Sequence, residues 1–158
     1  MPRAWLVKSE PDCYSFDELL ADGSTAWEGV RNYQARNFMR DGMRLGDPVL
    51  FYHSSTAIPA VVGLAKVARE AYPDPTQFDP DNQYYDPKST HEAPRWQLVD
   101  IAGVVALPRA VSLTELKATP GLEGMALLQP GSRLSVLPVE EEHLAAVLKL
   151  GGLAEGQW

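Results

Sequence analysis

The chain has 158 residues, of which 45% are hydrophobic and 22% are charged, a composition typical of one globular domain with a buried core. Its formal net charge of −7 argues against a protein that binds long duplex DNA non-specifically, because such proteins carry excess positive charge. The single cysteine, Cys13, excludes an internal disulfide and a cysteine-based zinc site.

The N-terminal part of the chain predicts a buried strand and then a capped helix. Residues 5–8 are an apolar run typical of a central strand, and Pro11 prevents the strand from continuing. Ser15 and Glu18 form a capping-box pattern, which predicts a helix as far as about residues 22–23. Neither a secretory leader nor an apolar run of about 18 residues occurs, so we expect a cytoplasmic protein without a membrane-spanning helix.

The stretch AWEGVRNYQARNFM, residues 26–39, combines aromatic rings, amides and arginines around one glycine, and it shows no strand alternation. We expect Trp27 at a strand end, Gly29 in a turn and Asn32 at the cap of a short helix whose inner face includes Tyr33. An indole at a turn, followed by amides and a guanidinium, can stack on a flat ring and hydrogen-bond its edge. Trp27 therefore either lines a pocket or closes the end of a sheet as a core residue.

The middle of the chain predicts a hairpin. A turn at residues 45–48 leads into an apolar strand at residues 49–52, and residues 60–70 form the returning strand. Gly63 marks a bulge or a close backbone approach.

The segment 72–94 contains five prolines and has no periodicity, which predicts a long loop. Tyr72, Phe78, Tyr84 and Tyr85 lie within it. These rings either hold the loop on the core or line a site.

The last third predicts two more strands and two helices. Residues 96–105 are a strongly apolar strand, and the pattern at residues 112–115 caps a brief helix. Residues 133–137 alternate like a strand with one exposed face, and a C-terminal helix ends at residues 151–152. The predicted fold class is α+β, with five or six strands in a strongly bent sheet approaching a barrel. One domain covers residues 1–152 and a loose tail covers residues 153–158.

Sequence motifs exclude several chemistries. The chain lacks the phosphate-binding, metalloprotease, EF-hand and serine-hydrolase motifs, and its carboxylates have no metal-ligand spacing, so we expect no metal and no cofactor. His91 and His143 are expected at the surface. His53 and Ser54 are neighbours on a strand and point to opposite faces, which argues against a catalytic pair. His53 is instead expected to orient a loop or to bind a ligand.

Several long motifs together resemble the EVE domain family across about residues 4–150. They are WLVKSEP (5–11), WEGVRNYQARNFMR (27–40), GDPVLFYHSS (46–55), GLAKVAREAYPDPTQF (63–78), YYDPKS (84–89), PRWQLVDI (94–101) and RLSVLPV (133–139). The resemblance implies a PUA-like fold, a small twisted β-barrel with flanking helices, related to the YTH domains that read a methylated base in RNA. It also implies a non-enzymatic module that binds a modified base, such as 5-methyl- or 5-hydroxymethylcytosine, in DNA or RNA.

Under this resemblance Trp27 matches the tryptophan of the family's aromatic cage, and Tyr84 or Tyr85 supplies the facing ring. The polar edge of a base in a dry pocket needs hydrogen-bond partners. The candidates at strand ends and turns are Ser9, Asn32 and His53.

Basic residues gather in the first third of the chain, which allows a local basic face on an acidic body. The candidates for phosphate contacts are Arg31, Arg36 and Lys88, and the alternative for each is a surface ion pair. We expect a monomer. The acidic balance also keeps a free nucleoside or nucleotide open as the ligand, which would make the protein a small-metabolite sensor. Further alternatives are a base-processing hydrolase using His53 and a protein-interaction scaffold.

Overall fold

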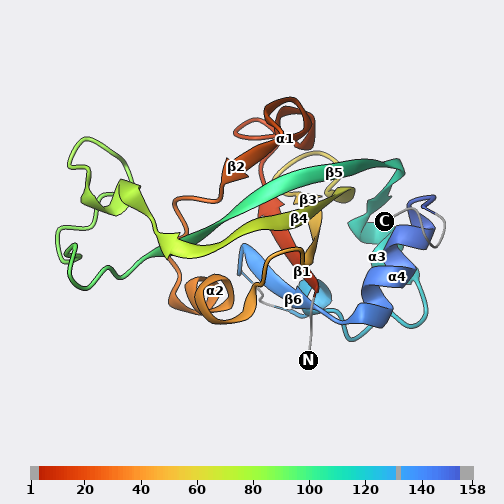
Figure 1. The fold of residues 1–158 in the computed structure, drawn as a ribbon. Coiled ribbons are helices and arrows are strands. Elements are labelled where there is room, and N and C mark those ends of the chain that lie inside the picture. Colours follow the sequence, from red (N-terminus) through yellow and green to blue (C-terminus); the bar gives the residue numbers. More distant parts are fainter. Residues whose placement is uncertain (1–3, 131–132, 154–158) are drawn as a thin grey trace.

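The computed structural model of the protein describes residues 4–130 and 133–153 (Figure 1). Within that part of the chain one mixed six-stranded sheet has the order β2-β5-β4-β3-β1-β6. β1 and β3 are parallel, and the other neighbours are antiparallel. The strands are β1 (Ala4–Ser9), β2 (Ser24–Ala26), β3 (Pro48–His53), β4 (Ala60–Pro73), β5 (Gln97–Ser112) and β6 (Val136–Val139).

Short helices connect these strands. The helices are α1 (Phe16–Asp22), α2 (Tyr33–Asn37), the π-helix η1 (Phe38–Gly42), the 3-10 helix η2 (Pro75–Phe78), α3 (Leu113–Ala118), the 3-10 helix η3 (Ala126–Leu128) and α4 (Glu141–Leu150). None of the described helices is long and apolar enough to cross a membrane. The predicted α+β class, a bent sheet with short flanking helices, is confirmed.

Local capping signals set the helix boundaries as predicted. The Ser15 side chain accepts the Glu18 N–H at 3.1 Å while Glu18 accepts the Ser15 N–H, so both halves of the capping box are present. Asn32 caps α2 by accepting the Ala35 N–H at 3.0 Å. Gly29 has a φ of 82°, a conformation that favours glycine, in the turn before that cap.

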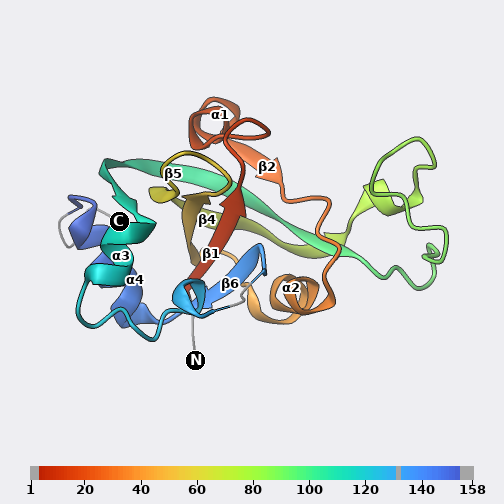
Figure 2. The same cartoon turned by 180° about the vertical axis from the view of Figure 1, so that it is seen from behind.

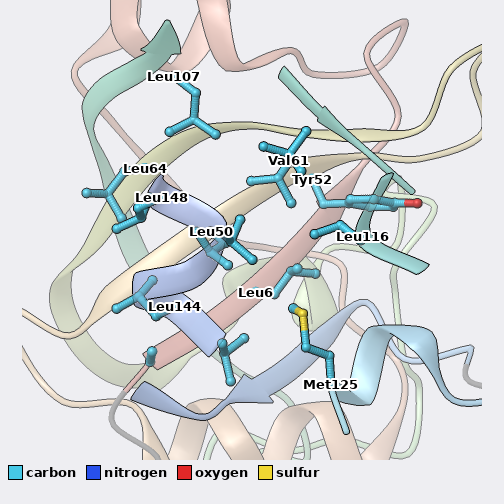
Figure 3. Close-up of a cluster of buried hydrophobic side chains, with 14 of the residues drawn as sticks. Leu6, Leu50, Tyr52, Val61, Leu64, Leu107, Leu116, Met125, Leu144 and Leu148 are labelled. Carbon is cyan, nitrogen blue, oxygen red and sulfur yellow. The ribbon is translucent and has the colours of Figure 1, made fainter. Parts of the chain in front are cut away.

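Helices cover both faces of the sheet because neighbouring strand residues point to opposite sides. On one face, Leu6 and Leu50 pack against Leu144 and Leu148 of α4 and against Leu116 of α3 (Figure 3). The other face packs against α1 and the α2–η1 segment. Its cluster includes Val7, Phe16, Ala35, Met39 and Phe51.

The sheet is not a closed barrel. β2 and β6 are its two edges, and no backbone pairing joins them in the described ranges. β2 is only three residues long, so it offers little backbone for such a pairing. Val30, which follows β2, and Val136 of β6 belong to the same buried cluster.

The β4–β5 hairpin is longer than the sequence predicted, because β5 continues to Ser112. Its loop projects away from the body of the sheet, on the side opposite α3 and α4 (Figures 1 and 2). α2 lies between β6 and the base of this projecting loop in both views.

Three expectations about exposure are wrong. Tyr33 is 50% exposed, because α2 buries Ala35 instead. His143 is only 8% exposed, since it faces inward from the first turn of α4. β6 buries both Val136 and Leu137, so it has no exposed face there. Residues 154–158 of the expected tail lie outside the described residues.

Gly63 combines both features expected of it. The β3–β4 register shifts beside it, and its backbone touches the ring of Phe16. A Cβ at this position would overlap that ring, so Phe16 and α1 can approach the sheet only over a glycine.

We expect Gly63→Ala to lower the free energy of unfolding by about 1–3 kcal/mol, because the added methyl group overpacks a buried contact. Urea denaturation of the purified variant measures this loss. Gly124→Ala is the matched control, since its Cβ would meet only His143 Cε1, at an ordinary 3.6 Å. Equal stability of the two variants would contradict the packing role of Gly63.

Candidate functional site

Four rings meet at one end of the sheet, around Phe51 of β3. The ring of Trp27 meets Phe51 edge-on, with centroids 5.6 Å apart and planes at 84°. Phe16 lies 5.2 Å and His53 5.7 Å from the same ring. We call this group, made of Phe16, Trp27, Phe51 and His53, the aromatic corner. Edge-on packing around a buried ring fixes the orientation of each partner.

Trp27 is half-buried, so solvent reaches part of its indole. Its backbone N–H donates to the carbonyl of Val99 at 2.9 Å, which extends the β2–β5 pairing by one residue. The position at the end of a strand is the one predicted. An indole that is anchored by its backbone and by Phe51, yet partly open to water, is a platform on which a flat ligand can stack.

His53 holds the start of α1. Its Nε2 atom accepts the Phe16 N–H at 3.1 Å, and Phe16 is the first residue of the helix. Burial lowers the pKa of His53 below 6.5, and the charge of Asp17 only partly opposes this shift. The imidazole is therefore neutral at pH 7, with its proton on Nδ1.

Ser9 lies next to His53 in the parallel β1–β3 ladder. Its hydroxyl donates to the carbonyl of Tyr14 at 2.5 Å, and its own carbonyl accepts the Ser54 N–H at 3.0 Å. Ser9 and His53 follow Val7 and Phe51 by two residues, so they lie on the face that carries the aromatic corner. The structure thus places Ser9 and His53 side by side, and the rings of His53 and Trp27 both pack on Phe51.

A buried carboxylate connects this end of the sheet to the projecting loop. Asp74 is 0% exposed, and its Oδ2 accepts the Gly29 N–H at 2.9 Å and Arg31 Nη1 at 3.1 Å. Its Oδ1 accepts the backbone N–H of Thr76 at 2.8 Å and the Thr76 hydroxyl at 2.5 Å. Burial alone would raise the pKa of Asp74, but these hydrogen bonds outweigh it and hold the pKa below 3.8.

Arg31 also joins this end of the sheet to the projecting loop. Its five N–H donors make five hydrogen bonds, to the carbonyls of Val30 and Tyr84, the carboxylate of Asp74 and the hydroxyl of Thr76. In this arrangement no donor is left for a phosphate. The phosphate contact of Arg31 stays a prediction, and in this structure the guanidinium positions the projecting loop against the turn after Trp27.

The side-chain amide of Gln77 hydrogen-bonds the buried polar groups inside the projecting loop. Its amide nitrogen donates to the carbonyls of Asp74 and Trp96 at 2.7 and 2.8 Å. Its amide oxygen accepts the Ser89 hydroxyl at 2.5 Å and the Trp96 N–H at 3.0 Å. Together with Arg31, Asp74, Thr76 and Tyr84 it forms what we call the loop network. A fully satisfied buried network of this kind gives the long loop one conformation.

The two tyrosines of the loop have different surroundings. The ring of Tyr84 rests on the backbone of Gly29, with the guanidinium of Arg31 5.4 Å from its centroid. Tyr85 is 41% exposed. Neither ring stacks on Trp27 in the described structure, so the predicted facing ring stays a prediction.

The other predicted residues lie outside the aromatic corner. Asn32 uses its side-chain oxygen as the α2 cap, which leaves its amide N–H groups as donors. Arg36 lies with its guanidinium 4.8 Å from the Tyr33 ring, and burial lowers its pKa. Lys88 is exposed in the projecting loop. No set of three His, Cys, Asp or Glu residues suited to hold a metal ion occurs among the described residues.

Two important residues were missed at the sequence level. Phe51 was identified only as part of an apolar strand, and nothing local shows that other rings surround it. Asp74 had a detectable signal, since an aspartate before Pro75 and Thr76 has the pattern of a capping residue. That pattern predicts the bonds to Thr76 but not those to Gly29 and Arg31, which are far away in the sequence.

Known proteins resemble this chain closely. The family model of the EVE domain matches residues 3–150. Thymocyte nuclear protein 1 of Homo sapiens is 42% identical over 164 residues, which cover 92% of this chain and 72% of that protein. A crystal structure of a Pseudomonas putida protein has a TM-score of 0.90 and 48% identity, and covers 94% of this chain and 99% of that chain. A crystal structure of human THYN1 in complex with 5-methylcytosine-containing DNA has a TM-score of 0.87 and 41% identity. The match covers 96% of this chain and 98% of that chain.

We expect Asp74→Asn to lower the free energy of unfolding at pH 7 by about 2–4 kcal/mol, since the amide presents N–H groups to the donors of Gly29 and Arg31 or of Thr76. Asp79→Asn is the control, because Asp79 is an exposed carboxylate of the same loop. Urea denaturation of both variants measures the difference. A loss no larger than that of the control would contradict the role of Asp74.

The stabilisation from Asp74 also depends on pH. Its pKa is lower in the folded protein than the ordinary 3.8, so the unfolded chain binds the proton first as pH falls. The stabilisation is fully present at pH values well above 3.8. It is lost as the pH falls below 3.8 and through the lower pKa of the folded state. We therefore expect the stability difference between wild type and Asp74→Asn to shrink between pH 7 and pH 3. A constant difference would mean that the carboxylate charge contributes nothing.

Proposed function

Because the chain belongs to the EVE domain family, we propose that it binds nucleic acid carrying a modified base, such as 5-methylcytosine, at the aromatic corner. The observation that carries this proposal is that Trp27 is only partly buried, with its indole held edge-on by Phe51. The complex of human THYN1 with 5-methylcytosine-containing DNA supports the choice of ligand, since that domain shares the fold over nearly all of this chain.

In this proposal the base leaves its stack and lies against Trp27. Stacking on an aromatic side chain returns about 1–3 kcal/mol per base, which offsets part of the cost of unstacking. Trp27 is fixed before binding, so little of this energy is lost in ordering the side chain. The partner ring on the other side of the base is Tyr84 or Tyr85 in this proposal, and Tyr84 lies closer to the chain of Trp27 because it rests on Gly29.

The polar edge of the base meets Ser9 and His53. A neutral imidazole that accepts through Nε2 offers its Nδ1–H as a donor, which suits a ring nitrogen or carbonyl oxygen of the base. The Ser9 hydroxyl already donates to Tyr14 and keeps its lone pairs as acceptors. A single added methyl group gives discrimination of about 1–3 kcal/mol, so we expect modest selectivity over cytosine.

The role is binding without chemical conversion of the base. A hydrolase based on His53 would use one ring nitrogen of the imidazole as the general base. Nε2 already accepts the first N–H of α1, and Nδ1 carries the proton, so neither nitrogen is available. The net charge of −7 favours a second candidate ligand, a free modified nucleoside or nucleotide at the same corner.

We expect Trp27→Ala to weaken binding of a 5-methylcytosine-containing oligonucleotide by about 5- to 150-fold, the equivalent of one lost base stack. Trp27→Phe keeps a smaller ring and should lose less. Isothermal calorimetry gives the dissociation constants, and far-UV circular dichroism shows whether each variant is folded.

The control is Trp5→Phe, which changes a buried tryptophan of β1 outside both the aromatic corner and the projecting loop. A folded Trp27→Ala protein with the wild-type dissociation constant would refute the proposed site. An equal loss of affinity in the folded Trp5 variant would show a general effect on the fold and would also refute the site.

A further inference from the structure

The ring of Tyr33 lies between two other side chains. The indole of Trp96 stacks on it, with centroids 4.7 Å apart and planes at 20°. The Cζ atom of Arg36 lies over the same ring, 4.8 Å from its centroid. The two groups would overlap on one face, so Trp96 covers one face of the ring and Arg36 covers the other. Tyr33 is 50% exposed, and this exposed part therefore consists of the ring edge and the hydroxyl.

Three hydrogen bonds hold the guanidinium of Arg36 in this place. Nη1 donates to the backbone carbonyl of Arg95 at 2.8 Å. Nε and Nη2 donate to the side-chain oxygen of Asn37 at 3.1 and 2.7 Å. Because Arg95 directly precedes Trp96, Arg36 binds the backbone that carries the stacked indole as well as the ring of Tyr33. We call Tyr33, Arg36 and Trp96 the α2 clasp.

Trp96 is the residue at which the projecting loop returns to the sheet, directly before β5. It is 6% exposed, and its Nε1–H donates to Asp86 within the loop at 2.8 Å. Its backbone N–H donates to Gln77 at 3.0 Å, and its carbonyl accepts the Asp74 N–H at 3.0 Å. These bonds join both ends of the loop at Trp96. The α2 clasp therefore attaches the base of the whole loop to α2, which lies beside it in Figures 1 and 2.

The turn after the aromatic corner lies against the projecting loop at three places. Asp74 accepts the Gly29 N–H at 2.9 Å. The Cζ atom of Arg31 lies 5.2 Å from the centroid of Trp96. Tyr33 stacks on the same indole. The α2 clasp is the last of these contacts along the chain, and it fixes the start of α2 relative to the loop.

We propose that Tyr33 and Arg36 are positioning residues for the aromatic corner. The α2 clasp holds the projecting loop in the place where Tyr84, whose ring rests on Gly29, faces the base on Trp27. This inference rests on the proposed function and adds two residues to it that touch neither the base nor a phosphate. It assigns Arg36 to the stack on Tyr33 in place of a contact with the nucleic-acid backbone.

The first experiment uses 5-methyldeoxycytidine, a ligand without a phosphate group. We expect Arg36→Gln and Arg36→Lys both to weaken its binding by about 2- to 12-fold, the equivalent of one lost aromatic contact. Lysine keeps the positive charge but has no flat group to cover the ring and no fork of N–H groups for Asn37. Isothermal calorimetry gives the dissociation constants, and far-UV circular dichroism shows that each variant is folded.

A phosphate contact at Arg36 would give the opposite pattern. Nucleoside binding would then be unchanged in both variants. A nine-nucleotide DNA with one 5-methylcytosine would lose about 0.7 from the slope of log affinity against log salt in Arg36→Gln and would keep the slope in Arg36→Lys. The positioning role predicts the wild-type slope in both. Unchanged nucleoside affinity in the folded Arg36 variants would overturn the inference.

The control removes the same charge elsewhere. Arg109→Gln changes an exposed arginine that pairs with Glu115 of α3, on the side of the molecule opposite the projecting loop. We expect this variant to bind the nucleoside like wild type. A loss as large as that of Arg36→Gln would indicate a general effect of net charge and count against the α2 clasp.

The second experiment tests the ring of Tyr33 and observes the loop itself. Tyr33→Ala should weaken nucleoside binding by about 2- to 12-fold, whereas Tyr33→Phe keeps the stack and should bind like wild type. Hydrogen exchange reports the position of the loop without any ligand. In Tyr33→Ala we expect faster exchange at the N–H groups of Asp74 and Asp86, which donate to Trp96 and Gln77, and wild-type exchange in β3.

Exchange that is unchanged at Asp74 and Asp86, or that rises equally in β3, would contradict the positioning role, because the loop would then not depend on Tyr33. Failure of the proposed function has a different signature. If wild type does not bind the nucleoside or the DNA, the aromatic corner is not the site and the inference falls with it. If wild type binds and the Tyr33 and Arg36 variants bind equally well, only the inference is wrong.

Discussion

The buried carboxylate of Asp74 is the constraint that fixes the turn between Trp27 and α2. It binds the N–H of Gly29 and the guanidinium of Arg31, and it also caps η2 through Thr76. Gly29 lies between Trp27 and the cap of α2, so the position of this turn sets where the indole stands and where the helix begins. The projecting loop is thereby a structural part of the site, because without it the turn after Trp27 would lose its hydrogen-bond acceptor.

The two faces of the sheet have different roles. On one face α3 and α4 bury leucines and cover the strands, which stabilises the domain (Figure 3). The other face packs against α1 and the α2–η1 segment and carries the aromatic corner, and the sheet edges β2 and β6 do not pair within the described residues. The indole of Trp27, which follows β2, packs edge-on against Phe51 of β3.

Sequence reasoning succeeded where the cause was local. The capping residues Ser15 and Asn32 and the turn at Gly29 each follow from neighbours within a few positions, and the structure confirms them. It failed where contacts between distant segments decide. Asp74 and Arg31 are 43 residues apart, and the burial of His143 depends on the packing of α4 against the rest of the domain. The EVE resemblance supplied the candidate ligand and Trp27, but neither the ring packed behind Trp27 nor the open sheet.

The central claim is that the indole of Trp27 receives the modified base. Nuclear magnetic resonance of the indole Nε1–H groups during titration with 5-methyldeoxycytidine tests it directly. Trp5 and Trp96 are internal references, because their Nε1–H groups donate to Asp47 and Asp86. The account predicts that the Trp27 signal shifts to saturation, together with the imidazole of His53, while these two references stay in place. A saturable shift of Trp96 without any change at Trp27 would contradict it.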